Sequence, residues 1–150
     1  MRRDHVTLDV RYADPDGNQP PTAVLTVEES TDLLGERLVT SGGERLGADR
    51  IDVAFRFQTP VDAGDAAGVF SLSNRVTGEF VLEVNADAGP VLDIVETARD
   101  GSDDHKACYR VVVRQGDEDV AVYEKETLLV YDDDGNLLRQ HSLIPSGVEL

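Results

Sequence analysis

The stretch RIDVAFRFQ, Arg50–Gln58, alternates apolar and polar side chains more clearly than any other part of the chain. Its apolar members fall on one side of an extended backbone and are Ile51, Val53, Phe55 and Phe57. A repeat of two residues is typical of a β-strand that buries one face. The sequence therefore predicts a half-buried strand here, within a strand-rich fold.

The segment that follows predicts a β-hairpin. VFSLSN, Val69–Asn74, and EFVLEVN, Glu79–Asn85, flank the short link Arg75–Gly78, in which Gly78 closes the turn. Alternation along the second strand predicts three core side chains: Phe80, Leu82 and Val84. The side chains expected on its opposite face are Glu79, Val81 and Glu83.

Other segments carry the alternation or the β-branched residues typical of strands. They are Val6–Tyr12, Thr22–Glu28, His105–Gln115, Val120–Tyr131 and Leu137–Ile144. The sequence leaves open whether Val120–Tyr131 forms one long strand or two.

Two segments predict helices. Ser30–Val39 begins with N-cap residues, and Asp87–Asp100 places Pro90 in its first turn ahead of an apolar face. Strands and helices do not alternate regularly, which disfavours a parallel α/β fold. The expectation is a single α+β domain over residues 1–150, with a mainly antiparallel sheet and two helices packed on one face.

Two acidic stretches, DPDGN at Asp14–Asn18 and DDDGN at Asp132–Asn136, raise the question of a calcium loop. An EF-hand needs an acidic or amide ligand at its first position and Glu at its twelfth. With Gly135 at the sixth position, those places hold Val130 and His141. With Gly17 at the sixth position, the first and twelfth positions hold Tyr12 and Ala23, so both ligands are again missing. We therefore predict two tight turns and no metal site.

The chemistry-bearing residues form no recognisable catalytic pattern. The three histidines (His5, His105, His141) and the single Cys108 lack zinc-ligand spacing, and no Gly-x-Ser-x-Gly elbow or phosphate loop occurs. Cys108 has Lys106 and Arg110 two residues away on either side, an arrangement that could lower the pKa of its thiol. The sequence predicts no cofactor and favours a non-enzymatic role. In the alternative, a small enzyme or small-molecule binder, a pocket between helices and sheet would use His141, Ser142 or Cys108.

The charge balance is the strongest compositional signal. Thirty acidic residues face 14 basic ones, for a net charge of −16, and the only lysines are Lys106 and Lys125. Such a surplus makes a small domain repel itself in dilute buffer. At molar salt the Debye length falls to about 3 Å and most of that repulsion disappears. The composition thus predicts salt adaptation; disorder and the binding of basic partners are the alternatives.

The sequence predicts a cytoplasmic protein. No apolar run is long enough to cross a membrane, and the opening MRR is not followed by the apolar stretch of an export signal. One cysteine excludes an internal disulfide and fits a reducing compartment.

The C-terminal SLIPSGVEL ends an acidic chain with apolar residues. The candidate interaction residues are Leu143, Ile144, Pro145, Val148 and Leu150. This tail either folds back over a sheet edge or core opening, or docks a protein partner or a second copy of the chain. A nucleic-acid or ribosome accessory is a less favoured alternative. It would need Arg2, Arg3, Arg11 and Arg75 to converge on one face.

Four stretches resemble a family of uncharacterised, short, acidic haloarchaeal proteins. They are MRRDHVTLDV, DVAFRFQTP, VFSLSNRVTGEFVLEVNADA and LVYDDDGNLLRQHSLIPSGVEL. The resemblance implies a cytoplasmic protein of a halophilic archaeon, in agreement with the charge. It implies no activity, ligand or catalytic residue. Residues and resemblance together favour a salt-adapted interaction or regulatory module.

Overall fold

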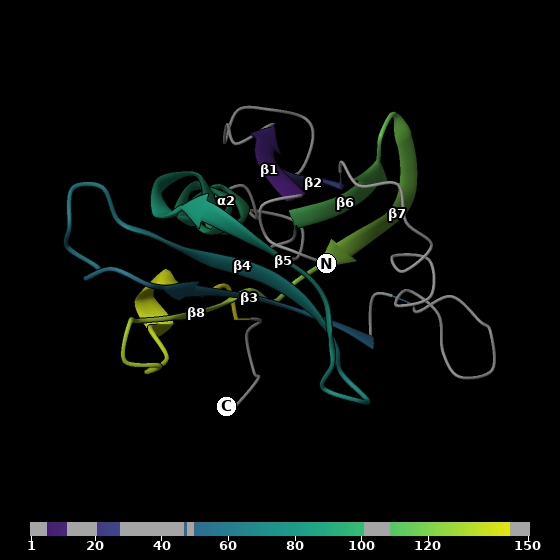
Figure 1. The fold of residues 1–150 in the computed structure, drawn as a ribbon. Coiled ribbons are helices and arrows are strands. Elements are labelled where there is room, and N and C mark those ends of the chain that lie inside the picture. Colours follow the sequence, from purple (N-terminus) through teal and green to yellow (C-terminus); the bar gives the residue numbers. More distant parts are fainter. Residues whose placement is uncertain (1–5, 12–20, 28–46, 48–49, 101–108, 145–150) are drawn as a thin grey trace.

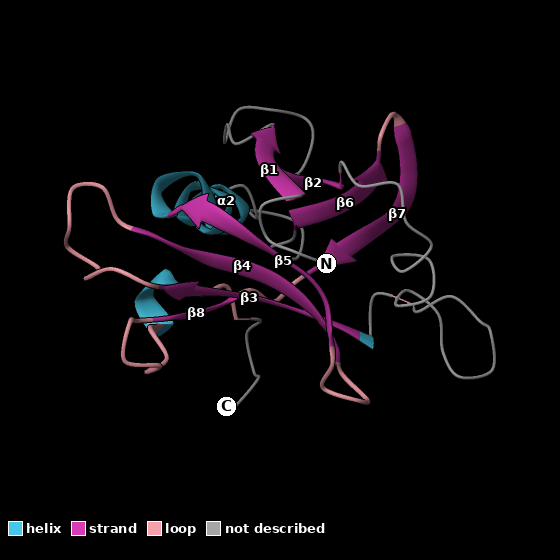
Figure 2. Cartoon of the chain, viewed as in Figure 1, coloured by secondary structure: helices cyan, strands magenta, loops and turns pink. Residues whose placement is uncertain are grey.

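The computed structural model describes residues 6–11, 21–27, 47, 50–100 and 109–144 (Figure 1). Strands dominate these residues, which also contain the α-helix α2 and the short 3-10 helix η3 (Figure 2). The elements in chain order are β1 (Val6–Arg11), β2 (Thr22–Val27), β3 (Ile51–Phe57), β4 (Ala67–Asn74), β5 (Phe80–Asp87), α2 (Ala88–Asp100), β6 (Tyr109–Gln115), β7 (Glu118–Lys125), β8 (Leu129–Tyr131) and η3 (Arg139–His141).

The strands form two four-stranded sheets rather than one. The first sheet has the order β1-β2-β6-β7 and the second β5-β4-β3-β8. Each contains one parallel pair, β2–β6 in the first and β3–β8 in the second, beside antiparallel pairs. The prediction of a mainly antiparallel sheet with two helices on one face is therefore wrong. The helix predicted over Ser30–Val39 lies outside the described residues.

The two sheets share a core because each strand buries the apolar half of its alternating pattern. The inner faces contribute Leu25, Val111 and Val113 from the first sheet and Phe55 and Phe70 from the second, all fully buried. Helix α2 confirms the prediction over Asp87–Asp100 and lies against β1 and β5 (Figure 1). Its buried face consists of Val91, Ile94, Val95 and Ala98.

The segment Val120–Tyr131 resolves into two strands in different sheets. β7 ends the first sheet at Lys125, and after a short crossing β8 joins the second. Two buried side chains hold this crossing. Lys125 Nζ donates to the Ile51 carbonyl at 2.6 Å, and the Tyr109 hydroxyl donates to the Thr127 carbonyl at 2.6 Å.

Strand β5 departs from the alternation expected of it. Leu72 pairs with Leu82 while Ser73 pairs with Phe80, so Val81 is an extra residue in a β-bulge. As a result Val81 and Leu82 are both 1% exposed, whereas Phe80 is 52% exposed. The prediction that Phe80 faces the core and Val81 does not is wrong.

The end of the described chain returns along β8 without forming the strand predicted over Leu137–Ile144. Isolated bridges join Tyr131 to Leu137 and Leu128 to Leu143, with η3 between them. The turn predicted at Asp132–Asn136 is confirmed. Gly135 has φ +87°, and Asp132 Oδ1 accepts hydrogen bonds from the amides of Asp134 and Asn136.

Candidate functional site

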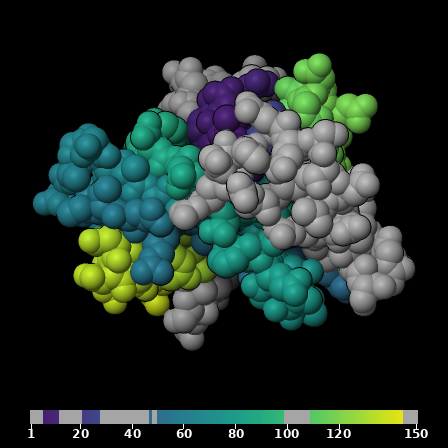
Figure 3. Space-filling model, in the orientation of Figure 1, coloured from purple at the N-terminus to yellow at the C-terminus, as the bar shows by residue number. Residues whose placement is uncertain are grey.

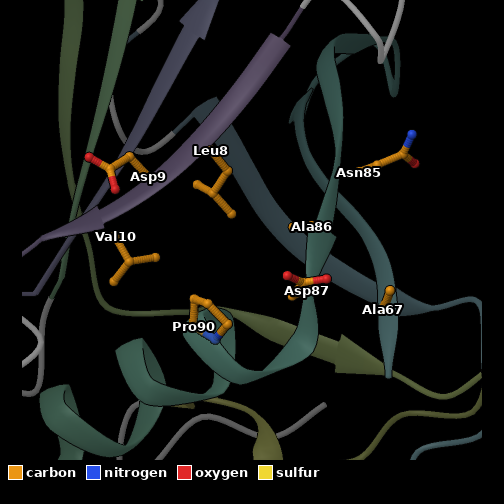
Figure 4. Close-up of a pocket in the computed structure, with 8 residues that line it drawn as sticks. All are labelled: Leu8, Asp9, Val10, Ala67, Asn85, Ala86, Asp87 and Pro90. Carbon is orange, nitrogen blue, oxygen red and sulfur yellow. The ribbon is translucent and has the colours of Figure 1, made fainter. Parts of the chain in front are cut away.

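The end strands of the two sheets, β1 and β5, lie side by side without pairing (Figures 1 and 3). Between them and the first turn of α2 the surface is hollowed by a cavity of about 430 Å³, shown in Figure 4. We call it the edge notch. Its lining consists of Leu8, Asp9, Val10, Ala67, Asn85, Ala86, Asp87 and Pro90.

Apolar side chains form the walls of the edge notch, and the Asp87 carboxylate supplies its charge. In Figure 4, Leu8 and Val10 point from β1 toward Pro90, while Asp9 lies on the other side of the strand. Asp87 ends β5 directly before the first residue of α2, where the helix dipole stabilises a negative charge. None of the described residues that line the notch is basic. The arrangement suits an apolar group that carries a positive charge.

The start of α2 is fixed in place on the floor of the notch. The Ala88 amide donates to the Ala66 carbonyl at 2.9 Å, which ties the helix to the segment leading into β4. This contact sets the position of Asp87 relative to Ala67, so the notch is a preformed feature of the backbone.

The structure places the predicted tail residues in two groups. Leu143 is 3% exposed, belongs to the core, and exchanges two hydrogen bonds of 2.9 Å with the Leu128 backbone. Ile144 is half-buried. Pro145, Val148 and Leu150 lie outside the described residues. The first residue of the tail is thus part of the fold.

Comparison with known proteins gives a family. A protein-family model matches residues 1–150, the whole chain. The chain belongs to DUF5793, a family of unknown function. No curated protein matches this DUF5793 chain, and no solved structure does. In the described part of the chain, no helix is long and apolar enough to cross a membrane.

Two of the polar residues singled out from the DUF5793 sequence, His141 and Ser142, lie among the described residues. Ser142 is buried, donates its hydroxyl to the Leu138 carbonyl at 2.8 Å and accepts from the Val130 amide at 2.9 Å. His141, the residue before Ser142, is half-buried on η3. The hydroxyl of Ser142 therefore has a structural role. His5, His105, Lys106 and Cys108 lie outside the described residues.

The acidic turn of the DUF5793 chain is explained by its own hydrogen bonds. Carboxylate oxygens of Asp132, Asp133 and Asp134 lie within 4.8 Å of one another, all at least partly exposed. Hydrogen bonding from the Asn136 amide lowers the pKa of Asp132, with smaller contributions from Asp134 and Gly135. This keeps the Asp132 carboxylate ionised and holds the turn closed.

The arginines proposed for nucleic-acid contact are separated in the described residues. Arg11 lies on β1 and pairs with Asp9 at 3.1 Å, whereas Arg75 lies in the β4–β5 turn and pairs with Asp52 at 2.8 Å. Arg2 and Arg3 are outside the described part.

Sequence reasoning missed the edge notch. Its two walls come from strands of different sheets, and their proximity leaves no local signal in the sequence.

Proposed function

We propose that this DUF5793 protein is a non-catalytic interaction module that binds a basic segment of a partner protein in the edge notch. The observation that carries the proposal is the lining: apolar walls from Leu8, Val10 and Pro90 lie beside the Asp87 carboxylate, and no described lining residue is basic. A lysine or arginine side chain fits this chemistry, because its stem packs on apolar surface while its head reaches a carboxylate.

The charge of the whole chain supports a basic partner. In dilute buffer a net charge of −16 attracts a positively charged protein over long range, whereas at molar salt screening restricts this attraction to charges about 3 Å apart. Specificity then comes from the short-range contact in the notch, where the exposed Asp87 carboxylate lies beside apolar side chains.

We also propose that the acidic surface adapts the protein to a cytoplasm of molar salt. The only lysine in the described residues is Lys125, and it is 7% exposed, so the described surface lacks exposed lysine. Acidic side chains remain exposed on strands, turns and α2, as at Asp93, Glu96 and Glu118.

The experiment is affinity capture from a molar-salt lysate of the source organism with matched baits. Ala86→Phe fills the notch, and Ala54→Phe places the same side chain on half-buried Ala54 of β3, outside the notch. We expect the partner captured by the unmodified chain to be lost with Ala86→Phe and kept with Ala54→Phe. Asp87→Asn should weaken binding about tenfold, the loss of one charge-assisted contact. Equal capture by all baits contradicts the proposal.

A small molecule in the same notch is the second candidate function. The cavity of about 430 Å³ falls within the ~300–1,000 Å³ typical of ligand pockets. The two candidates separate in the same experiment. A small-molecule site predicts no captured protein, together with a rise in melting temperature when a metabolite mixture is added, and Ala86→Phe abolishes that rise.

A further inference from the structure

The outward face of the first sheet carries a group of arginines at aligned positions. Strand register places Arg11 opposite Thr22 and Thr22 opposite Arg110, so these residues form one row across β1, β2 and β6. Arg114 follows Arg110 by four residues on β6, and even spacing along a strand keeps both on the same face. Three guanidinium groups from strands distant in sequence are thus collected on one surface.

These arginines line a hollow of about 270 Å³, which we call the arginine hollow. Its lining residues are Arg11, Thr22, Val24, Arg110, Val112, Arg114 and Asp119. Three guanidinium groups face one carboxylate there, in a chain whose net charge is −16. Each of these arginines has a carboxylate partner, so what the hollow offers an anion is several guanidinium N–H donors at one place.

The ion pairs around the hollow leave donors for a ligand. Arg11 pairs with Asp9 through Nε at 3.1 Å, and Arg110 pairs with Glu124 through Nη2 at 3.2 Å. Neither pair is bidentate, and a guanidinium offers five N–H donors. Asp9 and Glu124 do not line the hollow, so their carboxylates hold the arginines from outside it.

The third arginine is held more firmly. Arg114 lies 2.9 Å from Asp119 through Nε and donates through Nη2 to the Asp117 carbonyl at 3.0 Å. Its side chain is 30% exposed and that of Arg110 is 33% exposed. Val24 and Val112 supply apolar surface between the charges. Partial burial reduces screening by water and salt, so an anion seated here interacts more strongly than at an open surface.

We propose that the arginine hollow binds a phosphoryl group. The planar guanidinium fork matches the oxygens of phosphate, and three such groups around one small hollow match an anion with several acceptor oxygens. The site is separate from the edge notch and stands independently of the function proposed there.

The test is a titration of the isotope-labelled full chain with inorganic phosphate in molar KCl, followed by amide NMR shifts. We expect saturable shifts at Thr22, Val24, Arg110 and Val112 across the millimolar range. Arg110→Gln should raise the dissociation constant about tenfold, as expected for one charge-assisted hydrogen bond. Arg75→Gln is the matched control, because Arg75 also pairs with a carboxylate but lies in the turn between β4 and β5, away from the first sheet.

A second arm, with dimethyl phosphate, identifies the source of the phosphoryl group. Binding of phosphate alone assigns the site to a free or terminal phosphate, and equal binding of both assigns it to a phosphodiester. Absence of saturable shifts with either probe overturns the proposal. An equal loss of affinity in Arg75→Gln and Arg110→Gln also overturns it, since the effect would then come from net charge.

Discussion

At the scale of single residues, the Ser142 hydroxyl links the start of η3 to β8: it donates a hydrogen bond to the Leu138 carbonyl and accepts one from the Val130 amide. We predict that Ser142→Ala lowers the free energy of unfolding by about 1–3 kcal/mol, because the buried Val130 amide loses its acceptor. Ser71→Ala is the control, since Ser71 lies half-buried on the outward face of β4 and its substitution should change stability by less than about 0.5 kcal/mol. Urea unfolding in molar KCl measures both, and similar values for the two variants would rule out the structural role of Ser142.

Tyr109 makes the free energy of unfolding depend on pH in the alkaline range. Its side chain is fully buried, and burial raises the pKa of its hydroxyl well above the ordinary value near 10. The folded state therefore holds this proton more tightly than the unfolded state. Its contribution to stability is complete below about pH 10 and is lost as the pH rises further, by up to about 1.4 kcal/mol per pH unit.

The variant Tyr109→Phe isolates this effect. We expect the free energy of unfolding of the variant to decline less steeply above about pH 10 than that of the unmodified chain. At neutral pH the variant should be less stable, because the Thr127 carbonyl loses its donor. Parallel pH profiles for the two proteins would contradict the assignment.

At the scale of elements, the bulge in β5 decides which side chains enter the core. We predict that Val81→Ala costs about 2 kcal/mol, through lost burial and the cavity left behind, whereas Phe80→Ala changes stability by less than about 0.5 kcal/mol. Denaturant unfolding of the two variants checks this. Strict alternation along the strand predicts the reverse order, so the experiment distinguishes the two registers directly.

The sequence predicts individual elements better than their arrangement, for a physical reason. Apolar periodicity is local, and it located the strands β3 and β4 and the helix α2 closely. The bulge at Val81 and the passage of the chain between sheets after Lys125 depend on contacts with distant strands. Both parallel pairs also join segments far apart in sequence, so hairpin patterns could not reveal them.

For the candidate site, too, local patterns could be predicted from the sequence and contacts between distant elements could not. Leu8, Val10 and Asn85 of the edge notch were predicted in strands and Pro90 in a helix, but no short pattern shows that residues of these elements share one cavity. Ser142 and Leu143 were noticed in the sequence because of their types, and the structure gives both a place in the fold.

At the scale of the whole molecule, the net charge of −16 sets the response to salt. We predict that the melting temperature rises as KCl increases from dilute buffer to molar concentration, because screening removes repulsion among exposed acids. A neutral osmolyte series at equal water activity serves as the control. A melting temperature that does not change with KCl would contradict salt adaptation.

The central claim is that a partner binds in the edge notch, and site-specific photocrosslinking tests it most directly. A photoreactive side chain at Asn85, on the rim of the notch, is compared with one at Val76, exposed at the tip of the β4–β5 hairpin. The account predicts a crosslink from position 85 to a lysine- or arginine-rich segment of one protein, and none to that protein from position 76. Equal crosslinking from both positions, or from neither, would contradict it.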